Sequence, residues 1–265
     1  MYLKTKEANL YYEVQGAGKP ILLIHGVVVD AGLYEHAARL LAPYYQVITY
    51  DRRGNSRSGE VYVEEYDISA QVRDAEALLE HLGIQRVFLA GTSAGAIVAQ
   101  ELMKARPALV SHLLMYEPPL VSLLEHQEEE QAWIARMEET ISRGRINTAM
   151  LEFMKSLGEV DDRREEKSEE EAFREMRNFQ HFMQQEFSVF LHYHPELSWF
   201  AGMCGKITVA IGERSGPSKY ARAAQAFQEK IGCELLHFPG CHNLPGDLPA
   251  DYVNSLMGVL ARKGW

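Results

Sequence analysis

The segment Gly91-Thr92-Ser93-Ala94-Gly95 combines residue types and spacing that could do chemistry. An apolar run that predicts a strand precedes it, and an amphipathic helical pattern follows it. The glycines permit a tight turn from strand to helix, which would push Ser93 into an exposed, strained position. A helix that begins there offers free N–H groups and a partial positive charge to a developing oxyanion. The pattern is therefore typical of a nucleophilic serine.

A second candidate is the glutamate in the stretch Leu-Leu-Met-Tyr-Glu-Pro-Pro-Leu, residues 113–120. The apolar residues 113–116 predict the end of a buried strand. Pro118 keeps Glu117 out of the helical backbone region, so the chain turns there and aims the carboxylate in a fixed direction. Glu117 is either a turn residue exposed to solvent or a functional carboxylate positioned by the end of the strand.

Short apolar runs that end at Gly, Asp, Glu or Pro predict the strands that position these residues. An opening antiparallel pair is expected within 2–14, followed by strands at 20–26, 45–51, 86–91, 111–116, 206–212 and 233–238. Helical patterns lie between or after them at 67–83, 96–107, 220–232 and 250–264. Alternating strands and helices predict an α/β fold with a doubly wound, mostly parallel sheet of eight strands.

The alternation stops from about Leu120 to Trp199, where only helical periodicity appears. Apolar side chains recur there at spacings of three and four, among them Met137, Phe153 and Phe182. A helical insertion between two strands must bury its apolar face, and the strand ends are the nearest surface. We therefore expect a core domain of residues 1–118 and 200–265 and an inserted helical cap, residues 119–199, whose underside lines a pocket.

The overall composition argues against several kinds of partner and cofactor. The 265 residues carry a formal net charge of −10, which argues against nucleic acid as a partner. No apolar stretch is long enough for a membrane span or a secretory leader, so no membrane partner is expected. Cys204, Cys233 and Cys241 are an odd number without a C-x-x-C pair, which favours a reducing cytoplasm over a disulfide framework or zinc site. Metal, flavin and nucleotide signatures are absent, so we expect no cofactor.

Three further motifs accompany the serine segment in a fixed order. His25-Gly26 follows the third predicted strand, and residues 51–58, DRRGNSRS, are similar to a D-x-R-G-x-G-x-S loop with Ser56 at the second glycine. FPGCHNLP, residues 238–245, is similar to a P-G-x-H segment after the last strand. With these motifs, essentially the full length of the chain resembles the α/β-hydrolase family.

The resemblance implies roles for individual residues. Ser93 would be the nucleophile, His242 the general base, and the backbone N–H groups of Val27 and Ala94 the oxyanion hole. These roles fit the chemistry, because serine attacks only when a base takes its proton and the tetrahedral intermediate needs fixed donors. His25 is expected to stabilise its turn rather than to act in catalysis.

The catalytic acid departs from the family pattern. The family usually places it after the seventh strand, three residues beyond a glycine, and that offset from Gly212 holds Ser215. A neutral serine can orient an imidazole but cannot offset the charge of an imidazolium.

The family has a second acid position, at the end of the sixth strand. The haloalkane dehalogenase branch has a glutamate there, 24 residues after its nucleophile, and Glu117 follows Ser93 by the same interval. We therefore prefer Glu117 as the acid. Glu213, Asp247 and the absence of any acid remain open.

Ser93 implies acyl transfer to water through an acyl-enzyme, whereas the dehalogenase branch uses an aspartate nucleophile. We expect a serine hydrolase for a small or medium, uncharged and apolar carboxylic ester, lactone or thioester. Two alternatives stay open: hydrolysis of a C–C bond in a β-diketone, and a ligand receptor that keeps the triad but turns over little substrate. The expected partner is a small-molecule substrate, whereas a receptor would act through movement of the cap and binding of a further partner.

Overall fold

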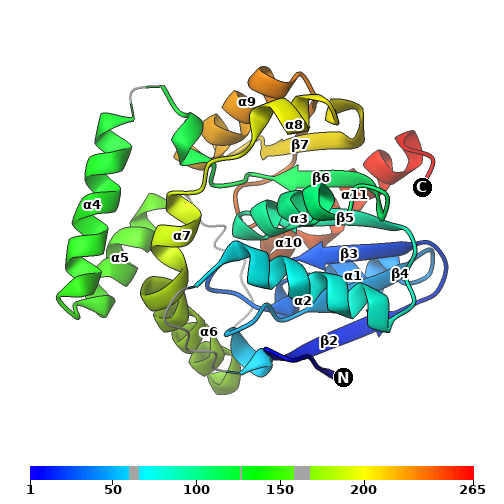
Figure 1. The fold of residues 1–265 in the computed structure, drawn as a ribbon, viewed down its shortest axis with the longest axis horizontal. Helices are drawn as coiled ribbons and strands as arrows, with labels where there is room; N and C mark the ends of the chain where they lie inside the picture. The colour runs from blue at the N-terminus through cyan, green and yellow to red at the C-terminus, as the bar shows by residue number, and fades with distance from the viewer. Residues whose placement is uncertain (60–65, 126, 158–167) are drawn as a thin grey trace.

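An eight-stranded sheet forms the centre of the computed structural model, which describes residues 1–59, 66–125, 127–157 and 168–265 (Figure 1). The strands are β1 (Tyr2–Lys4), β2 (Asn9–Gln15), β3 (Pro20–Ile24), β4 (Gln46–Tyr50), β5 (Val87–Thr92), β6 (Val110–Tyr116), β7 (Ile207–Gly212) and β8 (Glu234–Phe238). Their order is β1-β2-β4-β3-β5-β6-β7-β8. β2 is antiparallel to both neighbours, and the pairs from β4 to β8 are parallel. The expected α/β class and mostly parallel eight-stranded sheet are confirmed.

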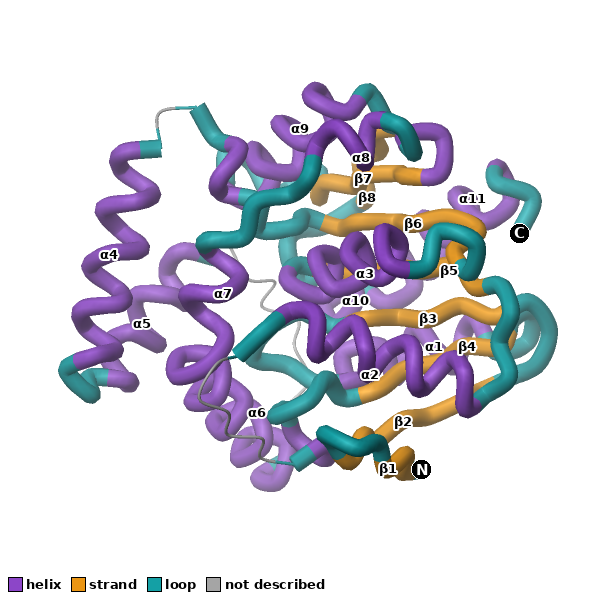
Figure 2. The backbone as a smooth tube through the Cα atoms, in the orientation of Figure 1, coloured by secondary structure: helices purple, strands orange, loops and turns teal. Residues whose placement is uncertain are grey.

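Helices cover both faces of this sheet (Figures 1 and 2). On one face pack α2 (Ile68–His81), α3 (Ala94–Ala105) and α9 (Lys219–Ile231); on the other pack α1 (Glu35–Leu41) and α11 (Pro249–Arg262). Neighbouring strand residues enter opposite cores because side chains alternate across a strand: Leu22 and Ile24 pack towards α3, Ile21 and Leu23 towards α1. The short helices α1 and α10 (Leu244–Asp247) were not predicted, since one or two turns show too little periodicity to detect.

The described residues between β6 and β7 form helices and no strand. These are α4 (Glu128–Ser142), α5 (Ile146–Ser156), α6 (Glu169–His181), a π-helix (Phe182–Glu186), α7 (Phe187–Leu191) and α8 (Leu197–Ala201), with short 3-10 turns at Val121–Leu123 and Cys204–Lys206. α4 to α7 lie off the carboxyl ends of the parallel strands (Figure 1). Residues 159–173, EVDDRREEKSEEEAF, are rich in acidic side chains, and most of them lie outside the described residues.

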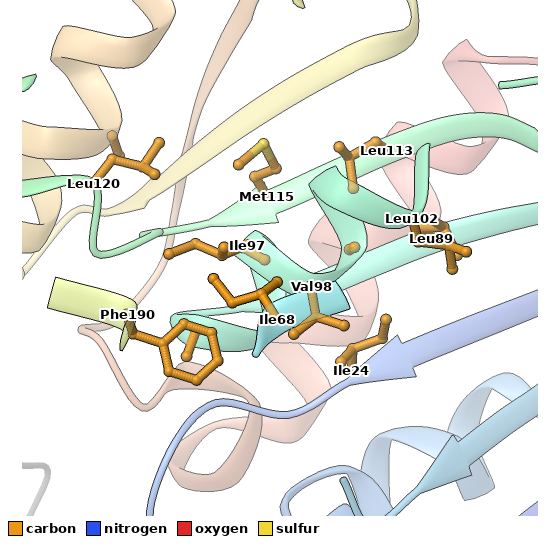
Figure 3. Close-up of a cluster of buried hydrophobic side chains, with 14 of the residues drawn as sticks. Ile24, Ile68, Leu89, Ile97, Val98, Leu102, Leu113, Met115, Leu120 and Phe190 are labelled. Atoms are coloured by element: carbon orange, nitrogen blue, oxygen red, sulfur yellow. The ribbon is translucent and has the colours of Figure 1, made fainter. Parts of the chain in front are cut away.

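The inserted helices share the core of the sheet. In Figure 3, Phe190 of α7 and Leu120 lie beside Ile68, Ile97 and Met115, which come from α2, α3 and β6. All five side chains belong to one buried apolar cluster. No described helix is both long and apolar enough to span a membrane.

Helix α6 reaches the loop after β4 through polar contacts. Asn178 accepts a hydrogen bond from the Ser56 N–H at 2.7 Å, and the Ser56 hydroxyl donates to Asp30 Oδ2 at 2.8 Å. Ser56 has a φ of 42°, a conformation that favours glycine, which explains why the resembling loop has glycine there. The hydrogen bonds of Ser56 help to hold this less favourable backbone in place.

The two glycines around Ser93 allow α3 to cross the strand ends at close range. A Cβ on Gly95 would lie 2.2 Å from the Ile24 carbonyl oxygen and 2.5 Å from that of His25. A Cβ on Gly91 would lie 2.5 Å from the Gly95 carbonyl oxygen. Any side chain here would push the start of α3 away from β3.

Gly95→Ala should therefore lower the free energy of unfolding by about 3 kcal/mol or more, because the clash involves backbone atoms that cannot move aside. Urea unfolding followed by circular dichroism measures the change. Gly205→Ala is the matched control, since a Cβ there has no atom within 4 Å, and it should change stability by less than about 0.5 kcal/mol. If the two variants are equally stable, the start of α3 does not pack as closely on the end of β3 as described.

Candidate active site

Ser93 occupies the turn between β5 and α3. Its backbone angles, φ 53° and ψ −128°, are strained for a residue with a side chain. The Ser93 N–H donates to the Tyr116 carbonyl oxygen at 2.9 Å, which ties the turn to the end of β6. The serine is 8% exposed and lines a cavity of about 800 Å³ together with His242. The turn thus presents a serine hydroxyl to a space that can hold a small molecule.

His242 and Glu117 meet although 125 residues separate them. His242 Nδ1 lies 2.7 Å from Glu117 Oε2. A carboxylate only accepts hydrogen bonds, so Nδ1 carries the proton and Nε2 is left free to accept one. The other Glu117 oxygen accepts from the Gly212 N–H at 2.8 Å. This arrangement fixes both the tautomer and the orientation of the imidazole.

The backbone at Glu117 is also constrained. Its φ is 44°, and its N–H donates to the Ala210 carbonyl oxygen of β7 at 3.1 Å. Pro118 follows directly, which restricts the backbone of Glu117 further. Glu117 is therefore held to β7 by its main chain and its side chain together.

Glu117 is completely buried, and burial alone would raise its pKa. The hydrogen bond and charge of His242 act in the opposite direction, as do nearby Ser215 and the Gly212 N–H. The net effect lowers the pKa of Glu117 below its usual value. The glutamate is therefore an anion at neutral pH, and it can stabilise a positive charge on His242.

The other candidate acids lie elsewhere. Glu213 is exposed, and Asp247 accepts a hydrogen bond from Asn243 at 2.6 Å. Ser215 is close to the backbone of Gly212, so the position that usually carries the acid adjoins the Glu117 carboxylate. Of the three carboxylates considered from the sequence, the structure brings Glu117 to the histidine.

Two tyrosines that the sequence did not single out hold the histidine loop. The ring of Tyr220 stacks on His242, with centroids 4.7 Å apart and planes at 30°. Tyr116 donates its hydroxyl to the Cys241 carbonyl oxygen at 2.7 Å. Because Tyr116 directly precedes the candidate acid Glu117, the sequence could have indicated its place near the site. No local pattern in the sequence marks Tyr220.

Val27 and Ala94 are the residues expected to form the oxyanion hole, and they lie in the loop after β3 and at the start of α3. Within the described part of the chain, no hydrogen bond uses the N–H of either residue. Gly26 touches the nucleophile closely, since a Cβ there would lie 2.9 Å from the Ser93 Cβ. Val28 has a φ of 63°, which is strained for a β-branched residue. Val27 follows Gly26 and Ala94 follows Ser93 in the chain, and both N–H groups lack a hydrogen-bond partner among the described residues.

His25 supports this loop rather than facing the cavity. Its Nε2 accepts from the Arg52 N–H at 2.9 Å, so Nδ1 carries the proton and donates to the Gly26 carbonyl oxygen at 2.7 Å. Complete burial, with the nearby Arg52 charge, lowers the pKa of His25 to about 3. A neutral, buried imidazole with both nitrogens occupied suits the expected structural role.

The cavity has apolar and charged walls. Apolar side chains come from the loop after β3 and from residues 153–157. Charged groups include Asp30, Arg57 and Arg174, and a hydrogen bond of 3.1 Å joins Arg174 to Asp30. The described residues contain no group of three or more His, Cys, Asp or Glu placed to hold a metal ion.

Comparisons with known proteins bear on the fold and the family of the chain. A model of the alpha/beta hydrolase family matches residues 21–255. The uncharacterized hydrolase YraK of Bacillus subtilis strain 168 is 31% identical over 245 residues, which cover 91% of this chain and 88% of YraK.

Two solved structures share the fold. A thermophilic esterase from Thermogutta terrifontis has a TM-score of 0.76 at 19% identity, covering 97% of this chain and 94% of that one. Est816, described as an N-acyl homoserine lactone degrading enzyme, has a TM-score of 0.76 at 19% identity, covering 97% and 99%. The family match over residues 21–255 and the relative of nearly full length show that this chain belongs to the α/β hydrolase family.

Proposed function

We propose that this hydrolase cleaves small or medium carboxylic esters, lactones or thioesters, with Ser93, His242 and Glu117 as its catalytic triad. The observation that carries the proposal is the 2.7 Å contact between His242 Nδ1 and the buried carboxylate of Glu117. It lies beside a cavity that the strained Ser93 turn also faces. The esterase and lactone-degrading proteins of the same fold are consistent with this class of substrate.

In the proposed reaction, Ser93 Oγ attacks the carbonyl carbon while His242 Nε2 takes the hydroxyl proton. Glu117 stabilises the resulting imidazolium, and the N–H groups of Val27 and Ala94 bind the oxygen that becomes negative. His242 then protonates the leaving alcohol or thiol, which leaves an acyl group on Ser93. Water, activated by His242, releases the acid and restores the serine.

We also propose that residues 119–199 act as a cap that shapes the acyl site. Phe153 and Met154 of α5 line the cavity with Val27, while Arg174 and Asn178 of α6 line another part of its wall. The apolar wall favours an uncharged, apolar acyl group. Most other phenylalanines of the insertion pack in the core, so they support the cap without facing the substrate.

A fluorophosphonate probe should label Ser93, because the turn and His242 together activate its hydroxyl. Intact mass and peptide mapping measure the adduct, and Ser93→Ala should carry none. Steady-state hydrolysis of p-nitrophenyl acetate should accompany labelling, which separates this enzyme from a receptor that reacts once. An adduct that persists in Ser93→Ala would rule out Ser93 as the nucleophile.

Glu117→Gln should lower turnover by roughly 10³- to 10⁴-fold, because an amide cannot stabilise the imidazolium. Glu213→Gln and Asp247→Asn are the matched controls and should each change turnover by about tenfold or less. Ser215→Asp placed in the Glu117→Gln background should restore part of the activity, since the new carboxylate adjoins the same site. If Glu117→Gln leaves turnover nearly unchanged while Glu213→Gln or Asp247→Asn abolishes it, the catalytic acid is Glu213 or Asp247 instead.

Met154→Trp should shorten the acyl chain that the site accepts, because the indole would fill part of the cavity. We expect kcat/KM for p-nitrophenyl octanoate to fall at least about tenfold relative to the acetate ester, within the range that steric changes in a pocket produce. Met176→Trp is the control, since Met176 of α6 is 52% exposed and is not among the lining residues. An unchanged ratio of the two substrates in Met154→Trp would refute the cap's role in selectivity.

A further inference from the structure

Arg52 is completely buried beside the proposed oxyanion hole, and its guanidinium contacts two different elements. Towards the loop after β3, Nε donates to the His25 carbonyl oxygen at 3.1 Å and Nη2 donates to that of Gly26 at 2.9 Å. Towards the inserted helices, Nη1 and Nη2 contact the two carboxylate oxygens of Glu186 at 2.7 and 3.1 Å. Arg52 therefore bridges the insertion to the loop that carries Val27.

The bond to Gly26 has a geometric consequence for Val27. In a trans peptide the C=O of one residue and the N–H of the next point in opposite directions. The Gly26 carbonyl oxygen is held on the Arg52 side by two donors, the guanidinium and His25 Nδ1. The Val27 N–H must then point away from Arg52. Val27 and Ser93 line the same cavity.

Glu186 is equally buried and fully hydrogen-bonded. It ends the π-helix Phe182–Glu186, a type of helix that is rare and often found at functional sites. Its Oε1 also accepts from the Tyr66 hydroxyl at 2.6 Å, and Gln71 links that hydroxyl to Arg52. The charge of Arg52 helps to keep the pKa of Glu186 well below its usual value, despite burial.

A buried ion pair is not in itself a source of stability, because the loss of hydration offsets the attraction. In this pair, however, the Arg52 guanidinium also donates hydrogen bonds to the backbone carbonyls of His25 and Gly26, which lie close to the Ser93 turn. A positioning role accounts for that choice of partners, whereas a purely stabilising role requires no particular carbonyl.

We propose that Arg52, clamped by Glu186, is a positioning residue that aims the Val27 N–H at the developing oxyanion. This inference rests on the proposed hydrolase function and deepens it. The inserted helices then do more than line the cavity: through Glu186 they set the geometry in which the transition state is stabilised.

The test is the paired variant Arg52→Met/Glu186→Leu, which removes both charges and leaves no unpaired ion in the core. It also removes the guanidinium donors to the carbonyl oxygens of His25 and Gly26, so that His25 Nδ1 remains as the side-chain donor to Gly26. Turnover of p-nitrophenyl acetate, per site labelled by fluorophosphonate, should fall about 10- to 100-fold, and KM should change less than about threefold. A misplaced N–H donor stabilises the transition state less, because the negative charge on the oxygen develops there, whereas substrate binding in the ground state changes little.

An alkyl trifluoromethyl ketone gives a second readout. Ser93 adds to its carbonyl carbon, His242 takes the serine proton, and the resulting hemiketal oxygen is negative. Its inhibition constant should rise by about the same factor as kcat/KM falls, while inhibition by the carboxylic acid product stays unchanged. A general loss of structure would weaken both inhibitors alike.

The neighbouring buried pair Arg53–Asp74 supplies the matched control. Arg53 Nε and Nη2 donate to Asp74 at 2.6 and 2.8 Å, and in the described part of the chain the Arg53 side chain makes no hydrogen bond to residues 25–27. Arg53→Met/Asp74→Leu should keep kcat within about threefold. Should the Arg52 pair variant fail to fold, Glu186→Gln, which keeps the guanidinium, should lower kcat by about three- to tenfold through a looser clamp.

Unchanged kcat and unchanged ketone affinity in the folded Arg52 pair variant would overturn the proposal, as would an equal loss in the Arg53 pair variant. If the Arg52 pair variant does not fold, an unaltered kcat in Glu186→Gln overturns it. A wild-type protein that neither turns over the ester nor reacts with the fluorophosphonate would instead overturn the proposed function. The two failures are therefore distinguishable.

Discussion

A carboxylate can be buried only where hydrogen bonds and an opposite charge replace its lost hydration. Glu117 lies at the end of β6 with no exposed surface, and its partners come from two other parts of the chain, the end of β7 with the turn after it and the loop after β8. Gly212 at the end of β7 and His242 after β8 supply its hydrogen bonds, and Ser215 lies close by. The position of the histidine loop is therefore tied to the buried charge of Glu117, because His242 supplies one of its hydrogen bonds. The ring of Tyr220 stacks on His242 and helps to hold it there.

Backbone strain is concentrated at the same edge of the sheet. Among the described residues, four that are not glycine have a positive φ, namely Val28, Ser56, Ser93 and Glu117. Each conformation of this kind costs on the order of 1–3 kcal/mol, and it persists only where surrounding packing fixes it. Three of the four belong to the proposed catalytic machinery or its loop. The large apolar core beneath them supplies the rigidity that holds the strained turns.

Much of this architecture could be predicted from local signals. Apolar runs located the six strands β3 to β8, because buried parallel strands have a distinctive composition, and two-residue alternation located the antiparallel β1 and β2. The glycine spacing located the turn at Ser93. The interval between Ser93 and Glu117, with Ser215 at the usual acid position, was enough to favour the carboxylate that the structure brings to His242.

Other parts of the site depend on tertiary contacts that leave no local pattern. Arg52 occupies a variable position of its motif, and Glu186 looks like one acidic residue among many in a helical segment. Only the fold brings them together, 134 residues apart, next to the His25 and Gly26 carbonyl groups. Tyr220 likewise carries no sequence signal, because stacking on an imidazole requires no particular neighbours in the chain.

The central claim is that Ser93, His242 and Glu117 act with the N–H groups of Val27 and Ala94 as one catalytic unit. A crystal structure of the fluorophosphonate adduct tests it most directly. The account predicts phosphorus bonded to Ser93 Oγ, with the phosphoryl oxygen about 2.7–3.1 Å from both N–H groups and the Glu117–His242 bond intact. A phosphoryl oxygen directed away from Val27 and Ala94, or a histidine bonded to another carboxylate, would contradict it.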